Sequence, residues 1–148
     1  MTNVKHTVQA CLWAALLAGF ATQPWCEESV DSWERVVFHL DETANARWSL
    51  MLAQSYMDDS PRAKIVVVAY GPGIDFLLED AKDKHGDPYD QAVLSLVNRG
   101  VEFRVCAATL GARKIAKVDL IDAVSVVPSG ISEIARLQLK EGYAYLKP

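Results

Sequence analysis

The chain has 148 residues, of which 51% are hydrophobic and 23% are charged, a composition that suits one globular domain and excludes a disordered or collagen-like protein. Its formal net charge of −4 argues against a protein that binds nucleic acid by neutralising phosphates. Three cysteines are too few for a disulfide scaffold, and without a C-x-x-C pair the sequence offers no zinc knuckle.

The first pattern along the chain is an uncharged stretch over residues 10–21, with the sequence ACLWAALLAGFA. As a helix it would span about 18 Å, which is too short for the ~30 Å hydrocarbon core of a membrane. Its length, and the small residues Gly19 and Ala21 near its end, instead favour a signal peptide over residues 1–21, or up to residue 26. A buried N-terminal helix or an uncleaved anchor is the alternative.

Export has two consequences for the mature chain. We expect a periplasmic or otherwise exported protein that is not held in a membrane and that begins with an extension over residues 22–34. Removal of the signal peptide also removes Cys11, so that Cys26 and Cys106 remain. In an oxidising compartment these two thiols can pair with each other, pair between chains, or stay free.

Residues 35–79 contain two expected strands and two expected helices. A short run of β-formers at 35–40 is followed by residues 45–57, in which apolar side chains recur at helical spacing. Residues 64–70, KIVVVAY, are rich in β-branched side chains without alternation, which is typical of a strand covered on both faces. After a GPG turn, a short helix is expected over residues 74–79.

The rest of the chain repeats this alternation. The expected elements are a helix over residues 89–98, a strand over 101–107, a helix over 109–117, a strand over 123–127, a helix over 130–141 and a fifth strand over 143–147. Thr109 and Ser129 are expected to cap the last two helices, and Gly142 to end the final one. The alternation predicts a single-domain α/β fold of flavodoxin-like type, with a mostly parallel sheet of four or five strands and helices on both faces.

Several residues that could bind a ligand or take part in catalysis follow the expected strands. Parallel strands end at one edge of an open sheet, and ligands bind beyond that edge. The residues at these strand ends are His39, Gly71, Pro72, Gly73, Cys106, Ser129 and Gly130. We therefore expect them to share one edge of the sheet. The spacing of His39, Asp41 and His85 is not that of a metal site, so no metal is expected.

Cys106 stands between an expected strand and an expected helix. The N–H groups and the dipole of a helix start stabilise a thiolate, and such positions make cysteines reactive. Arg104 and Arg113 are close enough in sequence to lower the pKa of the thiol further. A small buried side chain without chemistry is the alternative.

The other residues at this edge have two interpretations each. His39 is either a general base for Cys106 or a polar contact satisfied by the backbone. Residues 71–73 either let the backbone approach a ligand or a neighbouring chain, or form a plain turn. Ser129 lacks a G-x-S-x-G elbow, which favours helix capping over nucleophilic catalysis.

Four segments in succession carry a family resemblance. They are VVFHLDE (36–42), KIVVVAYGPGIDFL (64–77), LVNRGVEFRVCAATL (96–110) and VVPSGISEIARLQLKEGYAYLKP (126–148). Together they resemble the DsrE/DsrF-like family of sulfur-metabolism proteins, and they identify residues 35–148 as the domain of an exported member. The resemblance implies a compact α/β fold, homotrimers or homohexamers and, in some members, a cysteine that carries sulfur as a persulfide. The matching position here is Cys106, and no organic cofactor is implied.

Three functions follow as hypotheses. The first is a sulfur-binding or sulfur-relay protein that exchanges sulfur with a donor or acceptor thiol protein through Cys106. The second is a non-catalytic oligomeric module, in which His39, residues 71–73 and residues 129–130 line a cleft for a small ligand or a subunit. The third is a thiol redox protein that uses Cys26 and Cys106.

Overall fold

The computed structural model describes residues 34–148. Residues 1–33 lie outside the described part, and with them the signal peptide expected over residues 1–21, most of the expected extension, and Cys26. No helix within residues 34–148 is both long enough and apolar enough to cross a membrane.

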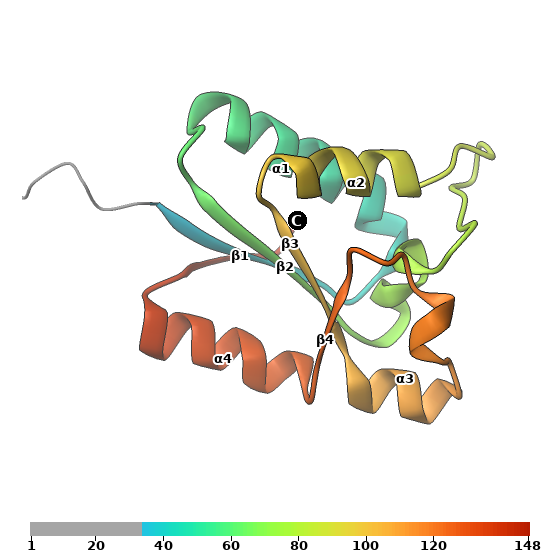
Figure 1. Ribbon diagram of the computed structural model, residues 1–148. Coiled ribbons are helices and arrows are strands. Elements are labelled where there is room, and N and C mark those ends of the chain that lie inside the picture. Colours follow the sequence, from blue (N-terminus) through green and yellow to red (C-terminus); the bar gives the residue numbers. More distant parts are fainter. Residues whose placement is uncertain (1–33) are drawn as a thin grey trace, which may run out of the picture. The chain divides into compact units, whose positions relative to one another are not determined.

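The centre of the domain is a sheet of five strands, all parallel (Figure 1). In chain order the strands are β1 (Arg35–Leu40), β2 (Lys64–Ala69), β3 (Glu102–Cys106), β4 (Ser125–Val127) and β5 (Ala144–Leu146). Their order across the sheet is β4-β3-β2-β1-β5. The parallel sheet confirms the predicted α/β fold class, and each strand lies close to its expected bounds.

Helices cover both faces of this sheet, as predicted. They are α1 (Ala46–Asp59), α2 (Asp90–Asn98), α3 (Ala107–Arg113) and α4 (Gly130–Glu141), with the 3-10 helices η1 (Thr43–Asn45), η2 (Gly71–Leu77) and η3 (Lys117–Asp119). Figure 1 shows α1 and α2 on one side of the sheet and α4 on the other, while α3 continues from the end of β3.

Two helices differ from their expected bounds by more than two residues. α3 begins at Ala107 rather than Thr109, because Cys106 itself is the extended N-cap residue, with φ −73° and ψ 116°. It ends before residue 117, because Lys114 takes a left-handed conformation with φ 57°. The short helix expected over residues 74–79 is η2, whose 3-10 conformation already starts in the GPG turn.

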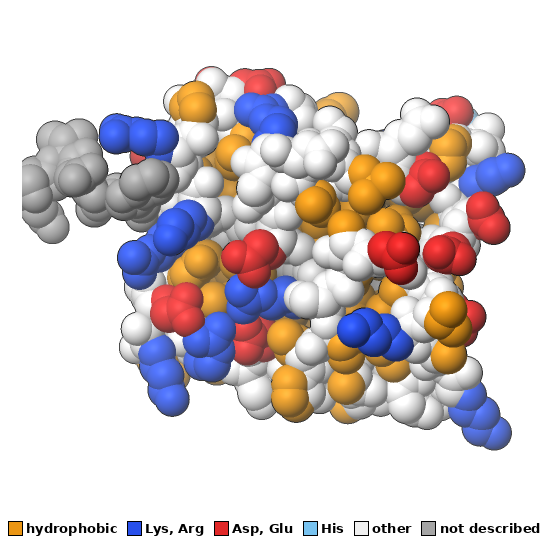
Figure 2. Space-filling view, viewed as in Figure 1, with side chains coloured by type: hydrophobic (Ala, Val, Ile, Leu, Met, Phe, Trp, Pro, Cys, Tyr) orange, Lys and Arg blue, Asp and Glu red, His pale blue; other side chains and the backbone are white. Residues whose placement is uncertain are grey.

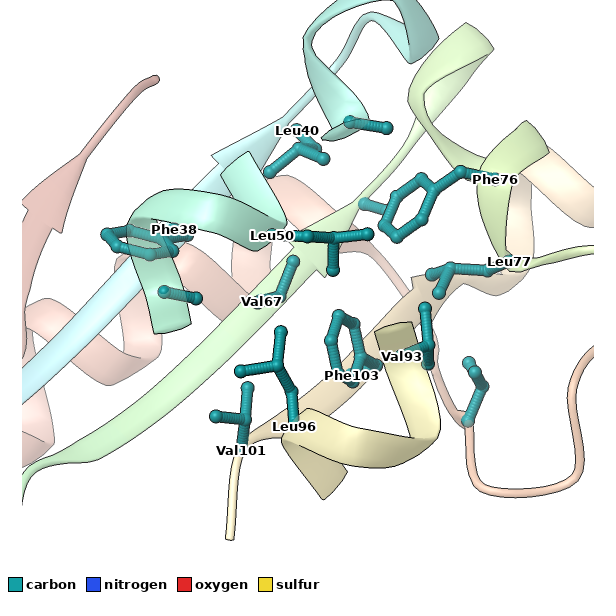
Figure 3. Packing of buried hydrophobic residues seen from close by; sticks show 14 of the residues in the cluster. Phe38, Leu40, Leu50, Val67, Phe76, Leu77, Val93, Leu96, Val101 and Phe103 are labelled. Carbon is teal, nitrogen blue, oxygen red and sulfur yellow. The ribbon is translucent and has the colours of Figure 1, made fainter. Parts of the chain in front are cut away.

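After their first residues, β1 and β2 are buried on both faces of the sheet, which explains why these two strands do not alternate in polarity. Val36, Phe38 and Leu40 of β1 pack into the larger hydrophobic cluster, with side chains of α1 and α2 (Figure 3). Val37 of the same strand packs into a second cluster with Leu137 of α4. Alternate residues of one strand therefore belong to separate cores.

The connections between strands define where a ligand site belongs. α1 and α2 connect β1 to β2 and β2 to β3 on one face, and the connection from β3 to β4 adds Leu120, Ile121 and Val124 to the same cluster. α4, which follows β4, covers the opposite face on its way to β5. β3 and β4 are therefore neighbours whose following connections go to opposite faces, and the gap between their carboxyl ends is the topological switch point.

η2 is docked on the end of β1 through a contact that only glycine permits. The N–H of Gly73 donates to the carbonyl of Asp41 at 3.0 Å. A Cβ at Gly73 would lie 2.7 Å from the carbonyl carbon of Leu40 and 2.8 Å from that of Asp41. The turn thus packs against the strand with no room for a side chain.

Gly73→Ala is expected to lower the free energy of unfolding by more than about 2 kcal/mol, because the added methyl collides with backbone atoms. Gly111→Ala is the matched control, since nothing lies within 4 Å of a Cβ there. Because Gly111 lies inside a helix, replacing it by alanine is expected to raise the free energy of unfolding by about 0.5–1 kcal/mol. Urea unfolding measures both changes, and wild-type stability of Gly73→Ala would contradict the contact.

Candidate functional site

Cys106 lies at the switch point, where the first turns of two helices meet. It ends β3 and caps α3, it is a free thiol among the described residues, and it is only 6% exposed. Gly130 is the first residue of α4, and a Cβ there would lie 3.4 Å from the Cβ of Cys106. The absence of a side chain at Gly130 therefore brings the start of α4 against the thiol.

Opposing effects set the pKa of the Cys106 thiol. Burial raises the pKa, because a thiolate is poorly solvated inside the protein. The backbone N–H groups of Gly130, Thr109 and Ala108 and the hydroxyl of Thr109 lower it, and the net result is a pKa below the usual value. The side chain makes no capping hydrogen bond of ordinary geometry, so we attribute this effect to N–H dipoles close to the sulfur.

The two arginines that were expected to lower this pKa have other partners. Arg104 forms an ion pair with Glu133, and Arg113 forms one with Asp75 at 2.5 Å. The main groups that lower the pKa of Cys106 are the N–H groups and the Thr109 hydroxyl. Carboxylates compensate the charge of both guanidinium groups, which leaves the N–H groups of two helix starts and the Thr109 hydroxyl as the source of the lowered pKa.

Thr109 joins the thiol to the GPG turn. Its Oγ1 accepts a hydrogen bond from the N–H of Gly71 at 3.0 Å, so its own proton is left for another acceptor. The same hydroxyl lowers the pKa of Cys106. Thr109 lies in the first turn of α3 and does not cap it, and this contact with the thiol was not foreseen from the sequence.

An open groove of about 570 Å³ lies between η2 and α3. Its walls are formed by Gly71, Pro72, Asp75, Ala108, Thr109, Ala112 and Arg113. Gly71 adopts φ 56°, a conformation that favours glycine. Of the turn expected to bind a ligand, Gly71 and Pro72 thus line a groove, whereas Gly73 packs on β1.

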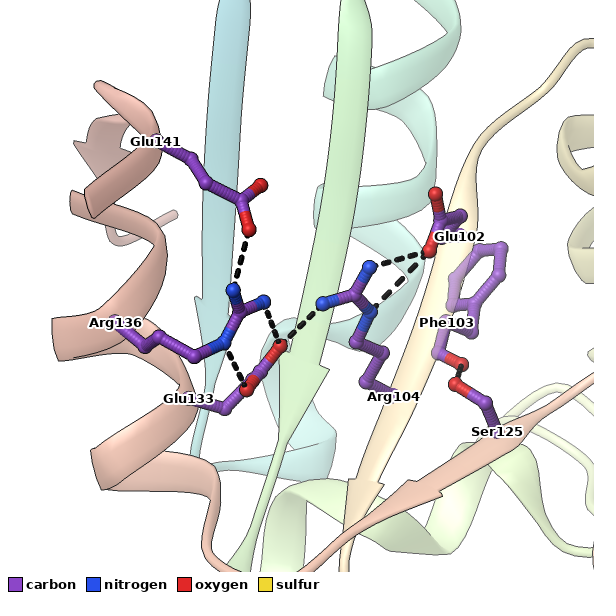
Figure 4. A network of polar contacts seen from close by, with 7 residues as sticks. All are labelled: Glu102, Phe103, Arg104, Ser125, Glu133, Arg136 and Glu141. Atoms are coloured by element: carbon purple, nitrogen blue, oxygen red, sulfur yellow. Dashed lines mark hydrogen bonds and ion pairs between the residues drawn. The ribbon is translucent and has the colours of Figure 1, made fainter.

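Ser129 and the first turn of α4 are held in place by polar contacts. The Oγ of Ser129 accepts a hydrogen bond from the N–H of Ser132 at 3.4 Å, which confirms the predicted cap. Glu133, in the first turn, accepts hydrogen bonds from Arg104 of β3 and from Arg136 (Figure 4). Because both partners of the Arg104–Glu133 pair are largely buried, this contact fixes the start of α4 over the end of β3.

His39 lies at the carboxyl end of β1 among aromatic side chains. Its Nδ1 is 2.6 Å from the hydroxyl of Tyr145, and its ring stacks on Tyr70 with centroids 4.7 Å apart. Tyr70 in turn lies against Gly130, because a Cβ there would be 3.0 Å from the Tyr70 ring. Tyr70 therefore links His39 to the helix start beside Cys106.

The second ring nitrogen of His39 has no hydrogen-bond partner among the described residues. Asp41 Oδ2 lies 3.9 Å from it and is held by Lys147 at 2.6 Å. A carboxylate on that side favours the tautomer with the proton on Nε2, so that Tyr145 donates to Nδ1. Burial lowers the pKa of His39, while Asp41 raises it and Lys147 lowers it.

Tyr70, Tyr145 and Lys147 were not recognised from the sequence as neighbours of His39. Only the pairing of β5 with β1 brings residues of the C-terminus beside the first strand. This pairing joins strands that lie far apart in the sequence, so no local sequence pattern predicts it. Among residues 34–148, no group of three or more His, Cys, Asp and Glu side chains could hold a metal ion.

Comparison with known proteins gives one family and several structures. The model of the DsrE/DsrF-like family matches residues 35–148. A protein of unknown function from Methanobacterium thermoautotrophicum is 36% identical, covering 78% of this chain and 99% of its own, with a TM-score of 0.70. The ychN protein from E. coli is 18% identical over the same share of both chains, with a TM-score of 0.65, and shows the fold alone. No curated protein matches.

Thr109→Val is expected to slow alkylation of Cys106 at neutral pH by about tenfold, because the thiolate loses one hydrogen-bonding group. Thr109→Ser keeps the hydroxyl and is expected to react like the parent protein. Rates of reaction with iodoacetamide between pH 5 and 10 in a Cys11→Ser/Cys26→Ser background measure the change. Identical pH profiles for the valine and serine variants would contradict the role of the hydroxyl.

Acidification is expected to destabilise the protein through His39. Its pKa is lower in the folded than in the unfolded chain, so the unfolded chain takes up a proton first, and stability falls as the pH drops through the ordinary histidine pKa of about 6.5 towards the lower folded pKa. His39→Asn should flatten this part of the profile. Urea unfolding at a series of pH values tests this, and parallel curves for the two proteins would contradict it.

Proposed function

We propose that this chain, which belongs to the DsrE/DsrF-like family, carries sulfane sulfur as a persulfide on Cys106. Family membership supports a role related to sulfur metabolism in general. The finer proposal is carried by one observation: the pKa of Cys106 is lowered although the thiol is buried, because N–H groups from two helix starts surround it. Such surroundings favour a thiolate, which is the nucleophile in sulfur exchange.

The chemistry consists of two exchanges. The Cys106 thiolate attacks the outer sulfur of a sulfane donor, the sulfur–sulfur bond of the donor breaks, and the donor leaves as a thiolate. An acceptor thiolate then attacks the terminal sulfur on Cys106, and the Cys106 thiolate is released again. Electrons balance in each step, so neither exchange needs an oxidant or an organic cofactor. The donor is therefore the persulfide of a small thiol or of a thiol protein, and the acceptor is a thiol or a thiol protein.

We further propose that the protein is exported to the periplasm and works as a homo-oligomer, either a trimer or a hexamer. Export follows from the signal peptide predicted over residues 1–21. Assembly into oligomers is implied by the family. The large apolar side chains of Val118, Ile131 and Leu139 are exposed and are available for contacts between subunits. On the face in Figure 2, apolar side chains lie in groups between acidic and basic ones.

Incubation with polysulfide is expected to add about 32 Da, the mass of one sulfur atom, to the intact protein. Cys106→Ser should abolish the adduct, whereas Cys11→Ser and Cys26→Ser, as controls, should keep it. Intact mass spectrometry with and without reductant reads out the adduct. Wild-type protein that never gains sulfur on Cys106 would overturn the carrier role, and a disulfide between Cys26 and Cys106 would favour the thiol redox function.

A further inference from the structure

We infer that the groove between η2 and α3 binds the carbon-bearing part of the sulfur donor, and that this donor is a small organic persulfide with a carboxylate held by Arg113. The inference rests on the proposed function of Cys106, and it deepens that function by naming the class of donor. It excludes inorganic sulfane sulfur as the preferred donor, because a donor without a carbon skeleton would leave the groove empty.

The first argument is the position of the groove. Ala108 and Thr109 line it, and both also contribute groups that lower the pKa of Cys106. The same turn of α3 therefore faces the groove and the thiol. A molecule in the groove therefore contacts residues that surround the sulfur, although Cys106 itself does not line the groove.

The second argument is the size and chemistry of the walls. A volume of about 570 Å³ falls within the range of small-molecule pockets. Pro72, Ala108 and Ala112 offer short apolar surfaces, which suit an alkyl chain better than a bare anion. The remaining charge is concentrated in Asp75 and Arg113.

The third argument is the free edge of Arg113. Its Nη1 makes both contacts found for this side chain, to Asp75 at 2.5 Å and to the carbonyl of Gly71 at 3.3 Å. Its Nε and Nη2 have no partner within residues 34–148. Nε and Nη2 form the edge of a guanidinium that binds a carboxylate through two parallel hydrogen bonds. Asp75 contacts Nη1 only, so a second carboxylate can bind the Nε–Nη2 edge of Arg113 without displacing Asp75.

The reaction in this arrangement is balanced. The Cys106 thiolate attacks the terminal sulfur of the bound persulfide R–S–SH, a new sulfur–sulfur bond forms on Cys106, and the bond within the donor breaks. The products are the Cys106 persulfide and the thiolate R–S⁻, and the charge is unchanged. The carboxylate of R stays on Arg113 throughout, so that it orients the donor.

The test begins with two alkylating reagents that differ in charge and little in size, iodoacetate and iodoacetamide. In a full-length Cys11→Ser/Cys26→Ser chain, Cys106 is the only thiol. The ratio of the two rate constants, divided by the same ratio for free cysteine, is expected to be about tenfold in favour of the carboxylate. A ratio equal to that of free cysteine would overturn the inference.

Arg113→Gln is expected to return this ratio to the value for free cysteine, and Arg113→Lys to keep part of the preference. Lys114→Gln is the matched control, because it removes the adjacent exposed cation, which does not line the groove. Thermal unfolding checks that the variants are folded. A preference that survives in Arg113→Gln, or that is lost equally in Lys114→Gln, would contradict the assignment to Arg113.

Sulfur loading separates this inference from the proposed function. Cysteine persulfide is expected to load Cys106 faster than its ethyl ester in the wild type, and at the same rate as the ester in Arg113→Gln. If polysulfide loads Cys106 but the acid and the ester react equally in the wild type, the donor assignment fails and the carrier function stands. If no donor loads Cys106 although iodoacetate is preferred, the carrier function fails, and the groove remains a carboxylate site.

Discussion

The contact between the first turn of α4 and the end of β3 is the constraint on which the site depends. A cysteine that is 6% exposed would normally have a raised thiol pKa, because burial disfavours the charged form. Here the N–H of Gly130 comes from an element that crosses the opposite face of the sheet from α1 and α2. Two helix starts therefore act on one sulfur, which a single strand–helix junction cannot achieve.

That contact needs both a small residue and an anchor. Gly130 supplies the space, since a Cβ would press on Tyr70 and Cys106. Glu133 supplies the anchor through Arg104, whose side chain is 17% exposed. Desolvation offsets much of the attraction within a largely buried ion pair, whereas removal of one partner leaves an uncompensated charge. The pair therefore contributes more to the position of α4 than to the overall stability.

Much of the fold was predictable from the sequence, because its signals are local. Runs of β-forming residues marked β1 and β2, and the Ser129 and Gly142 caps marked α4. The edge of the sheet that carries Cys106 and Gly130 followed from the rule for parallel strands. Their contact did not, since it depends on which face α4 crosses. Likewise, Tyr145 meets His39 only because β5 returns beside β1.

The same surroundings would serve both halves of the proposed sulfur relay. A low thiol pKa favours the attacking thiolate in the first exchange, and in the second it makes Cys106 a better leaving group. In the proposed carrier, a persulfide would hold its terminal sulfur about 2 Å from Sγ, the length of one sulfur–sulfur bond. The N–H groups and the Thr109 hydroxyl would then stay with Sγ, while the transferred sulfur is one bond removed from it. In the proposed relay, a thiol that is only 6% exposed would in this way pass on the outer sulfur while its own Sγ stays in place.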